Sequence, residues 1–338
     1  MNAICLVVDG LHAGYLGPYG NSWIETPNLN HLAAESLVCD AAYVDSPELE
    51  SLYRCFWSGQ HALDKGNGAL NLTDRLRDAG VMSTLVSDAP DVIADGTVAG
   101  FDDVLRVTSE SRTKPATEIG RTAMAELFAG AVNWLGGHDA PYCLWMHSRG
   151  MNAPWDGPVR LRNAFVDEDE EDPPATVEPV SRRLASGYDP DEVLAVRRMY
   201  AGQVQVFDAC LGGLLEAIDR YDPGDETLLV VTSAGGYPLG EHGAVGAVDD
   251  APYGERVQIP LFLRLPGGRS RGRRSPALVQ TTDIWPTLLD WWRMELPQGT
   301  RGTSLLPLVD DAAADTRDRL VIKGASGQRA MRTHRWYL

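Results

Sequence analysis

The sequence has few cysteines, and they form no recognisable pair. The five cysteines are odd in number, lie far apart in the chain and include no CxxC spacing. Disulfide-stabilised secreted domains and cysteine-rich zinc sites both depend on such pairs, so both classes are excluded. Cys5 and Cys143 lie in apolar strand-like runs, where cysteine packs as a small hydrophobic residue.

Positive charge is also scarce. The 338 residues include 30 Lys and Arg against 47 Asp and Glu, which gives a net charge of −17 and a pI near 4.8. A field of this sign repels phosphate backbones and anionic lipids, so nucleic acids and membrane surfaces are not expected partners. A local basic stretch, GGRSRGRRS at 267–275, is interpreted as a solvated loop between strands.

Long apolar runs are missing as well. No run is long enough to span a bilayer, and the chain opens with the strand-like AICLVVD instead of a basic segment followed by an apolar one. We therefore expect a cytoplasmic protein. A chain of this length and mixed composition can bury one large α/β domain with a smaller appendage.

Short apolar runs do alternate with amphipathic segments along the chain. Buried strands are predicted at 3–9, 81–88, 142–148, 228–231 and 259–266, and helices at 26–36, 71–80, 123–137, 189–221 and 281–292. Thr26 is a candidate N-cap, Gly80 a helix end, and Asp283 a helix N-terminal carboxylate. This alternation predicts an α/β fold in three layers, with helices on both faces of a mixed, mainly parallel sheet.

The chain is predicted to divide into two parts. Residues 1–268 form the α/β core, and 269–338 form a short C-terminal α/β subdomain, because the elements from about residue 279 onward are short. The segment DEDEEDPPATVEP at 167–179 is dense in negative charge and proline, which predicts a surface loop inserted in the core.

One segment, TLLVVTSAGGYPLGEHGAVG at 227–246, has the form of an active-site turn. A buried strand at 228–231 ends in a Gly-rich turn, and α/β enzymes place their chemistry in the loops after such strands. The tip of this turn, however, is Ala234, Gly235 and Gly236, which offer no side-chain ligand, acid or base.

Read in order, these segments resemble the sulfatase family of the alkaline phosphatase superfamily. The stretch LVVDGLHAGYLGPYGNSWIETPNLNHLA is similar to the family's N-terminal signature, and LYRCFWSGQHAL to its LLTGRYP segment. LRDAGVMSTLVSDAP is similar to the GKWH region, and TLLVVTSAGGYPLGEHG to the segment that contains SDHG. IPLFLRLPG, TTDIWPTLLDWW and GTSLLPL are similar to the segments that follow. The resemblance covers nearly the whole chain and implies the sulfatase-like three-layer α/β/α fold.

The same resemblance implies a site that hydrolyses sulfate or phosphate esters. Family members hold Ca²⁺ or a similar hard cation with carboxylates, and their nucleophile is a formylglycine made in a C/S-x-P-S-R motif and assisted by His and Lys. At the metal positions this chain has Asp9 but then Gly10. The nucleophile motif falls on Leu49 to Tyr53, with Leu49 at the nucleophile and Ser51 at the proline.

The remaining catalytic positions also differ. The Lys of GKWH corresponds to Asp88, the His of the middle strand to Asn152, and the Asp and His of SDHG to Ala234 and Gly235. No lysine occurs at 241–256, where the family places its last active-site lysine. Because Ca²⁺ takes about six to eight oxygen ligands, one carboxylate does not hold it, and no cofactor is predicted.

Three residues are left as catalytic or metal candidates. Asp9 is either a residual metal ligand or, as we favour, a strand-end carboxylate that accepts backbone N–H bonds. His147 at a strand end and His242 in LGEHG are residual catalytic candidates. We favour a structural role for both, with Glu241 and His242 shaping their loop.

Four residues are candidates for binding a ligand. Tyr53, Arg54 and Arg149 could form an anion site, with Asn152 beside them, because arginine grips sulfate or carboxylate in a bidentate way. The first hypothesis is therefore a sulfatase homologue without catalysis, which binds a small anionic ligand or pairs with an active sulfatase homologue. The second is an active sulfate or phosphate ester hydrolase with a relocated or misaligned site.

Overall fold

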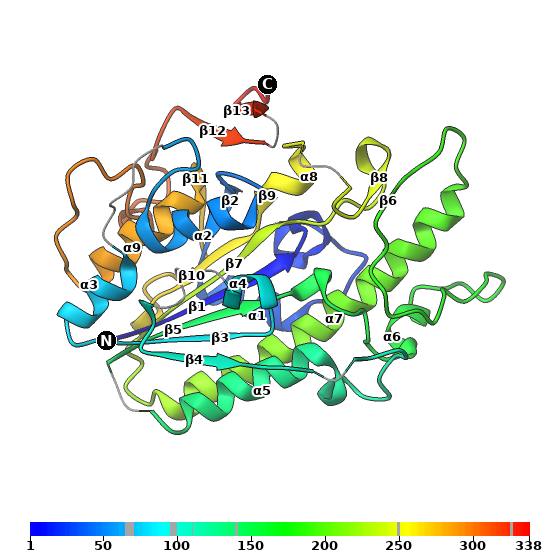
Figure 1. Cartoon of the computed structure of the whole chain (residues 1–338), viewed down its shortest axis with the longest axis horizontal. Helices are drawn as coiled ribbons and strands as arrows, with labels where there is room; N and C mark the ends of the chain where they lie inside the picture. The colour runs from blue at the N-terminus through cyan, green and yellow to red at the C-terminus, as the bar shows by residue number, and fades with distance from the viewer. Residues whose placement is uncertain (65–70, 95–99, 110, 139–140, 249–250, 325–326) are drawn as a thin grey trace.

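The fold is built on one large sheet, seen in a computed structural model that describes residues 1–64, 71–94, 100–109, 111–138, 141–248, 251–324 and 327–338 (Figure 1). Its strands are β1 (Asn2–Gly10), β2 (Leu37–Tyr43), β3 (Met82–Ser87), β4 (Asp103–Arg106), β5 (Tyr142–Ser148), β7 (Thr227–Gly236), β9 (Gln258–Ile259), β10 (Leu261–Arg264) and β11 (Arg273–Gln280). They lie in the order β11-β2-β10-β7-β1-β5-β3-β4, and β9 pairs with β2.

The sheet is mixed and mainly parallel. β1 pairs in parallel with β5 and β7, β3 with β4 and β5, and β11 with β2, whereas β10 runs antiparallel to both β2 and β7. The predicted strands at 3–9, 81–88, 142–148, 228–231 and 259–266 all lie in this sheet, so the predicted fold class is confirmed.

Helices cover both faces of the sheet. They are α1 (Pro27–Glu35), α2 (Leu49–Ser58), α3 (Leu72–Asp78), α4 (Pro90–Ala94), α5 (Ala123–Leu135), α6 (Val159–Asn163), α7 (Pro190–Tyr221), α8 (Gly254–Val257), α9 (Ile284–Trp291) and α10 (Pro307–Asp310). Figure 1 shows α5 and the long α7 along one face, with α2, α3 and α9 on the other. The predicted long helix at 189–221 is confirmed as α7.

The alternation of side chains along β1 explains why this strand is apolar throughout. Ala3, Cys5 and Val7 face a core that includes α2 and α9, while Ile4, Leu6 and Val8 face a core that includes α5 and α7. A strand with both faces buried needs an apolar residue at every position. β1 is thereby fixed in the middle of the sheet, and its last residues, Asp9 and Gly10, lie at the carboxyl edge.

Several local predictions can be compared with the structure. Gly80 follows α3 with φ +71°, and Asp283 completes a capping box with Gln280 at the start of the helical turn before α9, as predicted. Thr26 does precede α1, but its hydroxyl accepts from the Gly17 N–H at 3.1 Å and makes no cap bond. The loop prediction for 267–275 is wrong at its end, because Arg273–Ser275 start β11.

Two small antiparallel pairs lie outside the main sheet. β6 (Arg182–Arg183) pairs with β8 (Ala244–Val245), and β12 (Arg319–Lys323) with β13 (Arg329–Thr333). The division at residue 268 stays a prediction, and β11 beyond that point pairs with β2 in the main sheet. Across the described ranges, no helix is long and apolar enough to cross a membrane.

Candidate functional site

A cavity of about 360 Å³ lies at the carboxyl edge of the central strands. Gly10 and Asp9 enter it from β1, Ala234, Gly235 and Gly236 from β7, and Leu49 from the start of α2. Parallel strands bring these segments together, since Val7 pairs with both His147 and Thr232, and Gly10 pairs with Gly236. This is the edge at which open α/β sheets bind their ligands.

The surroundings of Gly10 leave little room for a side chain. Its φ is +69°, and a Cβ atom there would lie 3.0 Å from Met151 Cβ and 3.3 Å from Tyr237 Cδ2. Met151 is fully buried, so it has little freedom to move away. A carboxylate at this position, which the resemblance implies, would therefore meet tight packing.

Asp9, which lines the cavity, forms a polar pair with His147 of the neighbouring strand β5. His147 Nε2 lies 3.2 Å from Asp9 Oδ2, and both residues are buried. Asp9 Oδ1 and His147 Nδ1 have no hydrogen-bond partner among the described residues. The expected backbone N–H donors to Asp9 are replaced by the imidazole of the neighbouring strand.

The ligand set for Ca²⁺ is incomplete. Within the described ranges, no group of three or more His, Cys, Asp or Glu side chains is arranged to hold a metal ion. Asp9 and Asp91 are the carboxylates that line the cavity, and Asp9 already contacts His147. The Ca²⁺ implied by the resemblance therefore does not fit this donor set, which falls short of about six oxygens.

The first turn of α2 carries no exposed nucleophile into the cavity. Leu49 lines the cavity with an alkyl side chain. Ser51 is buried and donates to Glu48 Oε2 at 3.1 Å, while Lys323 Nζ from β12 binds the same carboxylate at 2.6 Å. Ser51 is thus part of a junction between α2 and the C-terminal hairpin.

The four predicted ligand-binding residues separate into two pairs. Arg149 and Asn152 line the cavity, and Arg149 reaches the Asn152 carbonyl at 3.5 Å. Tyr53 is only 1% exposed, packs on Trp57 with ring centroids 4.5 Å apart, and has a hydroxyl without a partner among the described residues. Neither Tyr53 nor Arg54 is among the residues that line this cavity.

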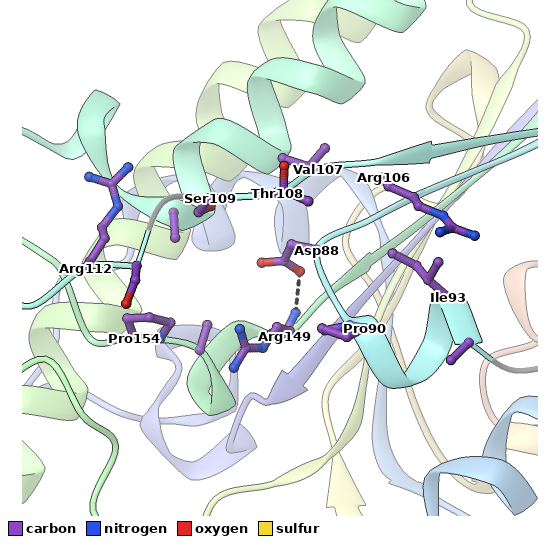
Figure 2. Close-up of a pocket in the computed structure, with 14 residues that line it drawn as sticks. Asp88, Pro90, Ile93, Arg106, Val107, Thr108, Ser109, Arg112, Arg149 and Pro154 are labelled. Carbon is purple, nitrogen blue, oxygen red and sulfur yellow. Dashed lines mark hydrogen bonds between the residues drawn. The ribbon is translucent and has the colours of Figure 1, made fainter.

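Asp88 lies beside Arg149 and lines a second cavity. Its Oδ1 accepts from the Arg149 backbone N–H at 2.8 Å. Burial raises the pKa of Asp88 to about 6, although the hydrogen bond and charge of Arg149 act in the opposite direction. The second cavity, of about 510 Å³, is lined by Asp88 and shares Pro90 and Arg149 with the first (Figure 2). No sequence pattern indicates this cavity, since its other walls come from distant segments.

His242 and Glu241 lie in a different loop. His242, with φ 48°, contacts Glu255 Oε1 at 2.8 Å and stacks on Tyr253 with ring centroids 3.9 Å apart. Glu241 Oε2 accepts from the Leu239 N–H at 2.5 Å. Both residues hold the loop in shape, and His242 is absent from the residues that line the cavity at Asp9.

Comparison with known proteins gives a consistent result. The sequence model of the family described as Sulfatase matches residues 1–294. The chain is 32% identical to the multifunctional alkaline phosphatase superfamily protein PehA of Trinickia caryophylli over 134 residues, 39% of this chain and 26% of that protein. It is 22% identical to an arylsulfatase of Clostridium perfringens over 94% of this chain and 80% of that one.

Solved structures show the same fold. The phosphonate monoester hydrolase of Agrobacterium radiobacter superposes with a TM-score of 0.80 at 17% identity, over 99% of this chain and 86% of that one. By sequence, the chain also resembles the N-acetylglucosamine-6-O-sulfatase of Bacteroides thetaiotaomicron, with 32% identity over 36% of this chain and 21% of that protein. The matches to this sulfatase and to PehA therefore cover only about a quarter or less of those proteins.

Proposed function

The chain belongs to the sulfatase family, and from this premise we propose that it is a non-catalytic member that binds a ligand or a partner at the remnant of the hydrolase site. The fold is that of a hydrolase, but a fold does not by itself fix an activity. The proposal therefore depends on the side chains in the cavity.

The observation that carries the proposal is the position of Leu49. It lines the cavity from the first residue of α2, at the position that the resemblance assigns to the nucleophile. An alkyl group cannot attack sulfur or phosphorus, and no base can activate it. Gly10 and Ala234, which line the same cavity, supply no oxygen ligand that could neutralise an ester anion.

The binding half of the proposal is supported by Arg149 and Asn152. Both line the cavity, and together they offer a guanidinium and an amide to a small anionic ligand. The other proposed partner is an active sulfatase homologue, with which this chain would associate.

The first test combines metal analysis with hydrolysis assays. We expect elemental analysis of the purified protein to find no stoichiometric divalent ion, and Ca²⁺ to leave the melting temperature unchanged, because only bound ligands shift it. We also expect no release of 4-nitrophenol from 4-nitrophenyl sulfate or 4-nitrophenyl phosphate.

A matched variant separates true activity from contamination. If the second hypothesis is correct and the chain is an active sulfate or phosphate ester hydrolase, hydrolysis will rise with protein concentration and fall in Asp9→Asn and His147→Ala. That result would overturn the proposal. Activity that persists unchanged in both variants would come from a contaminant, and removing it by further purification would leave the proposal standing.

A further inference from the structure

The second cavity is larger than the first. Its wall comes from the ends of three strands and the start of two helices: Asp88 follows β3, Arg106 ends β4, Arg149 follows β5, Pro90 begins α4 and Ala123 begins α5. Its volume of about 510 Å³ lies within the range of roughly 300–1,000 Å³ typical of pockets that hold organic ligands.

Three arginines line this cavity, and among the described residues one of them, Arg112, forms ion pairs. Arg112 pairs with Glu126 and with Asp156, whose Oδ2 lies 3.0 Å from Arg112 Nε. Arg106 and Arg149 have no carboxylate within ion-pair distance among the described residues. The charge of Arg149 does act on the neighbouring Asp88 carboxylate. Arg106 and Arg149 together still bring two positive charges to one cavity wall, against the single carboxylate of Asp88, in a chain of net charge −17.

The rest of the wall is partly apolar and partly hydroxyl-bearing. Ile93, Val107 and Pro154 supply apolar surface, and Thr108 and Ser109 supply hydroxyl groups, as Figure 2 shows. The Ser109 Oγ is buried and has no partner among the described residues. A ligand that satisfies these surfaces needs an apolar body as well as an acceptor group.

We propose that this second cavity binds an organic oxyanion, a sulfate, phosphate or carboxylate group carried on an apolar body, with Arg106 and Arg149 as its charge partners. Planar guanidinium groups form paired charge-assisted bonds with such oxyanions, and the apolar wall accepts the body. The inference rests on the proposed function in one respect: a sulfate or phosphate ester bound in this cavity is taken to remain intact.

The charge of Asp88 is expected to oppose anion binding, in contrast to the charges of the two arginines. Its carboxylate lines the cavity beside Arg149 and repels an anion when ionised. Asp88→Asn keeps an oxygen that accepts from the Arg149 N–H but removes the charge. Anion affinity should therefore rise in Asp88→Asn and fall when either arginine is neutralised.

The test is isothermal titration calorimetry with defined probes. The anionic probes are 4-nitrophenyl sulfate, 4-nitrophenyl phosphate and 4-nitrobenzoate, and the uncharged probe is 4-nitrobenzyl alcohol. We expect saturable binding of at least one anion and at least ~10-fold weaker binding in Arg106→Gln and in Arg149→Gln, since each loses a charge-assisted bond. Arg160→Gln, at an exposed position on α6, should match the wild type.

Two variants decide which cavity is used. Arg106 lines only the second cavity and Asn152 only the first, whereas Arg149 lines both. If Asn152→Ala weakens anion binding and Arg106→Gln does not, the ligand lies in the first cavity and this inference is wrong. Circular dichroism of each variant checks that the fold is intact.

The remaining outcomes separate this inference from the proposed function. If no anionic probe binds at millimolar concentration, or 4-nitrobenzyl alcohol binds equally well, the inference fails while the absence of hydrolysis still stands. If 4-nitrophenol is released in an Asp9-dependent way, the proposed function fails, and the effect of Arg106→Gln on affinity still tests the cavity.

Discussion

Replacing Gly10 with alanine tests whether neighbouring side chains fill the space at position 10, where the resemblance implies a second metal-binding carboxylate. An L-residue at φ +69° costs about 1–2 kcal/mol. The new Cβ would also lie 3.0 Å from the buried Met151 Cβ, and overpacking of this kind costs about 1–3 kcal/mol. The expected loss in the free energy of unfolding is therefore about 2–5 kcal/mol.

This loss is large enough to measure in two ways. An unfolding entropy of about 2.1 cal/mol/K per residue, taken over 338 residues, converts it to a fall of roughly 3–7 °C in melting temperature. Urea unfolding should show a lower midpoint with an unchanged slope. Gly10→Asp should be destabilised further, so a single substitution does not restore a two-carboxylate site.

Gly80 provides the matched control. Its φ is +71°, almost the same as that of Gly10, but a Cβ there would meet nothing within 4 Å. Gly80→Ala should therefore show only the backbone cost of about 1–2 kcal/mol. If the two alanine variants lose the same stability, or Gly10→Ala loses none, the space beside Asp9 is not closed and the packing argument is refuted.

Three further predictions concern Asp88, Tyr53 and Arg162. Burial raises the pKa of Asp88 to about 6 from an ordinary value near 3.9. The free energy of unfolding should therefore fall by at most about 3 kcal/mol as the pH rises from about 4 to about 6. Asp88→Asn should remove this pH dependence, measured by urea titrations. Tyr53→Phe should leave stability unchanged or raise it by up to ~1 kcal/mol, because the buried hydroxyl has no described partner; weaker binding of 4-nitrophenyl sulfate would instead place Tyr53 in the ligand site. Arg162 donates to three backbone carbonyls, two of them within 167–179. Arg162→Met should therefore lower the free energy of unfolding by about 2–4 kcal/mol and speed proteolysis within that segment. Arg160→Met, the control, should show neither effect.

The sheet was predictable because its pattern is local. Strands buried on both faces must be apolar throughout, so 3–9, 142–148 and 228–231 could be identified from composition alone. Gly80 was recognised because a helix end favours the left-handed backbone that glycine adopts.

The contacts between strands were not predictable in the same way. The approach of His147 to Asp9 depends on the pairing register of β1 and β5, which no local pattern specifies. The burial of Tyr53 depends on how α2 lies over the sheet, with Trp57 and His147 against its ring. The second cavity depends on β4, only four residues long, being placed next to β3.

The retained turn after β7 has a structural use that does not require a catalytic side chain. Ser233, just before the Gly-rich tip, donates to the Val8 carbonyl at 2.6 Å and accepts from the Leu11 N–H at 3.3 Å, so it ties β7 to the end of β1. At Gly236, a Cβ would collide with the Glu255 carbonyl oxygen, and at Gly235 it would lie 3.2 Å from that of Arg256. The tip thus packs its backbone against 255–256, which a ligand-bearing side chain at Gly236 would prevent. This close packing, together with the Ser233 bridge, gives the turn a structural role that does not depend on whether the chain hydrolyses an ester.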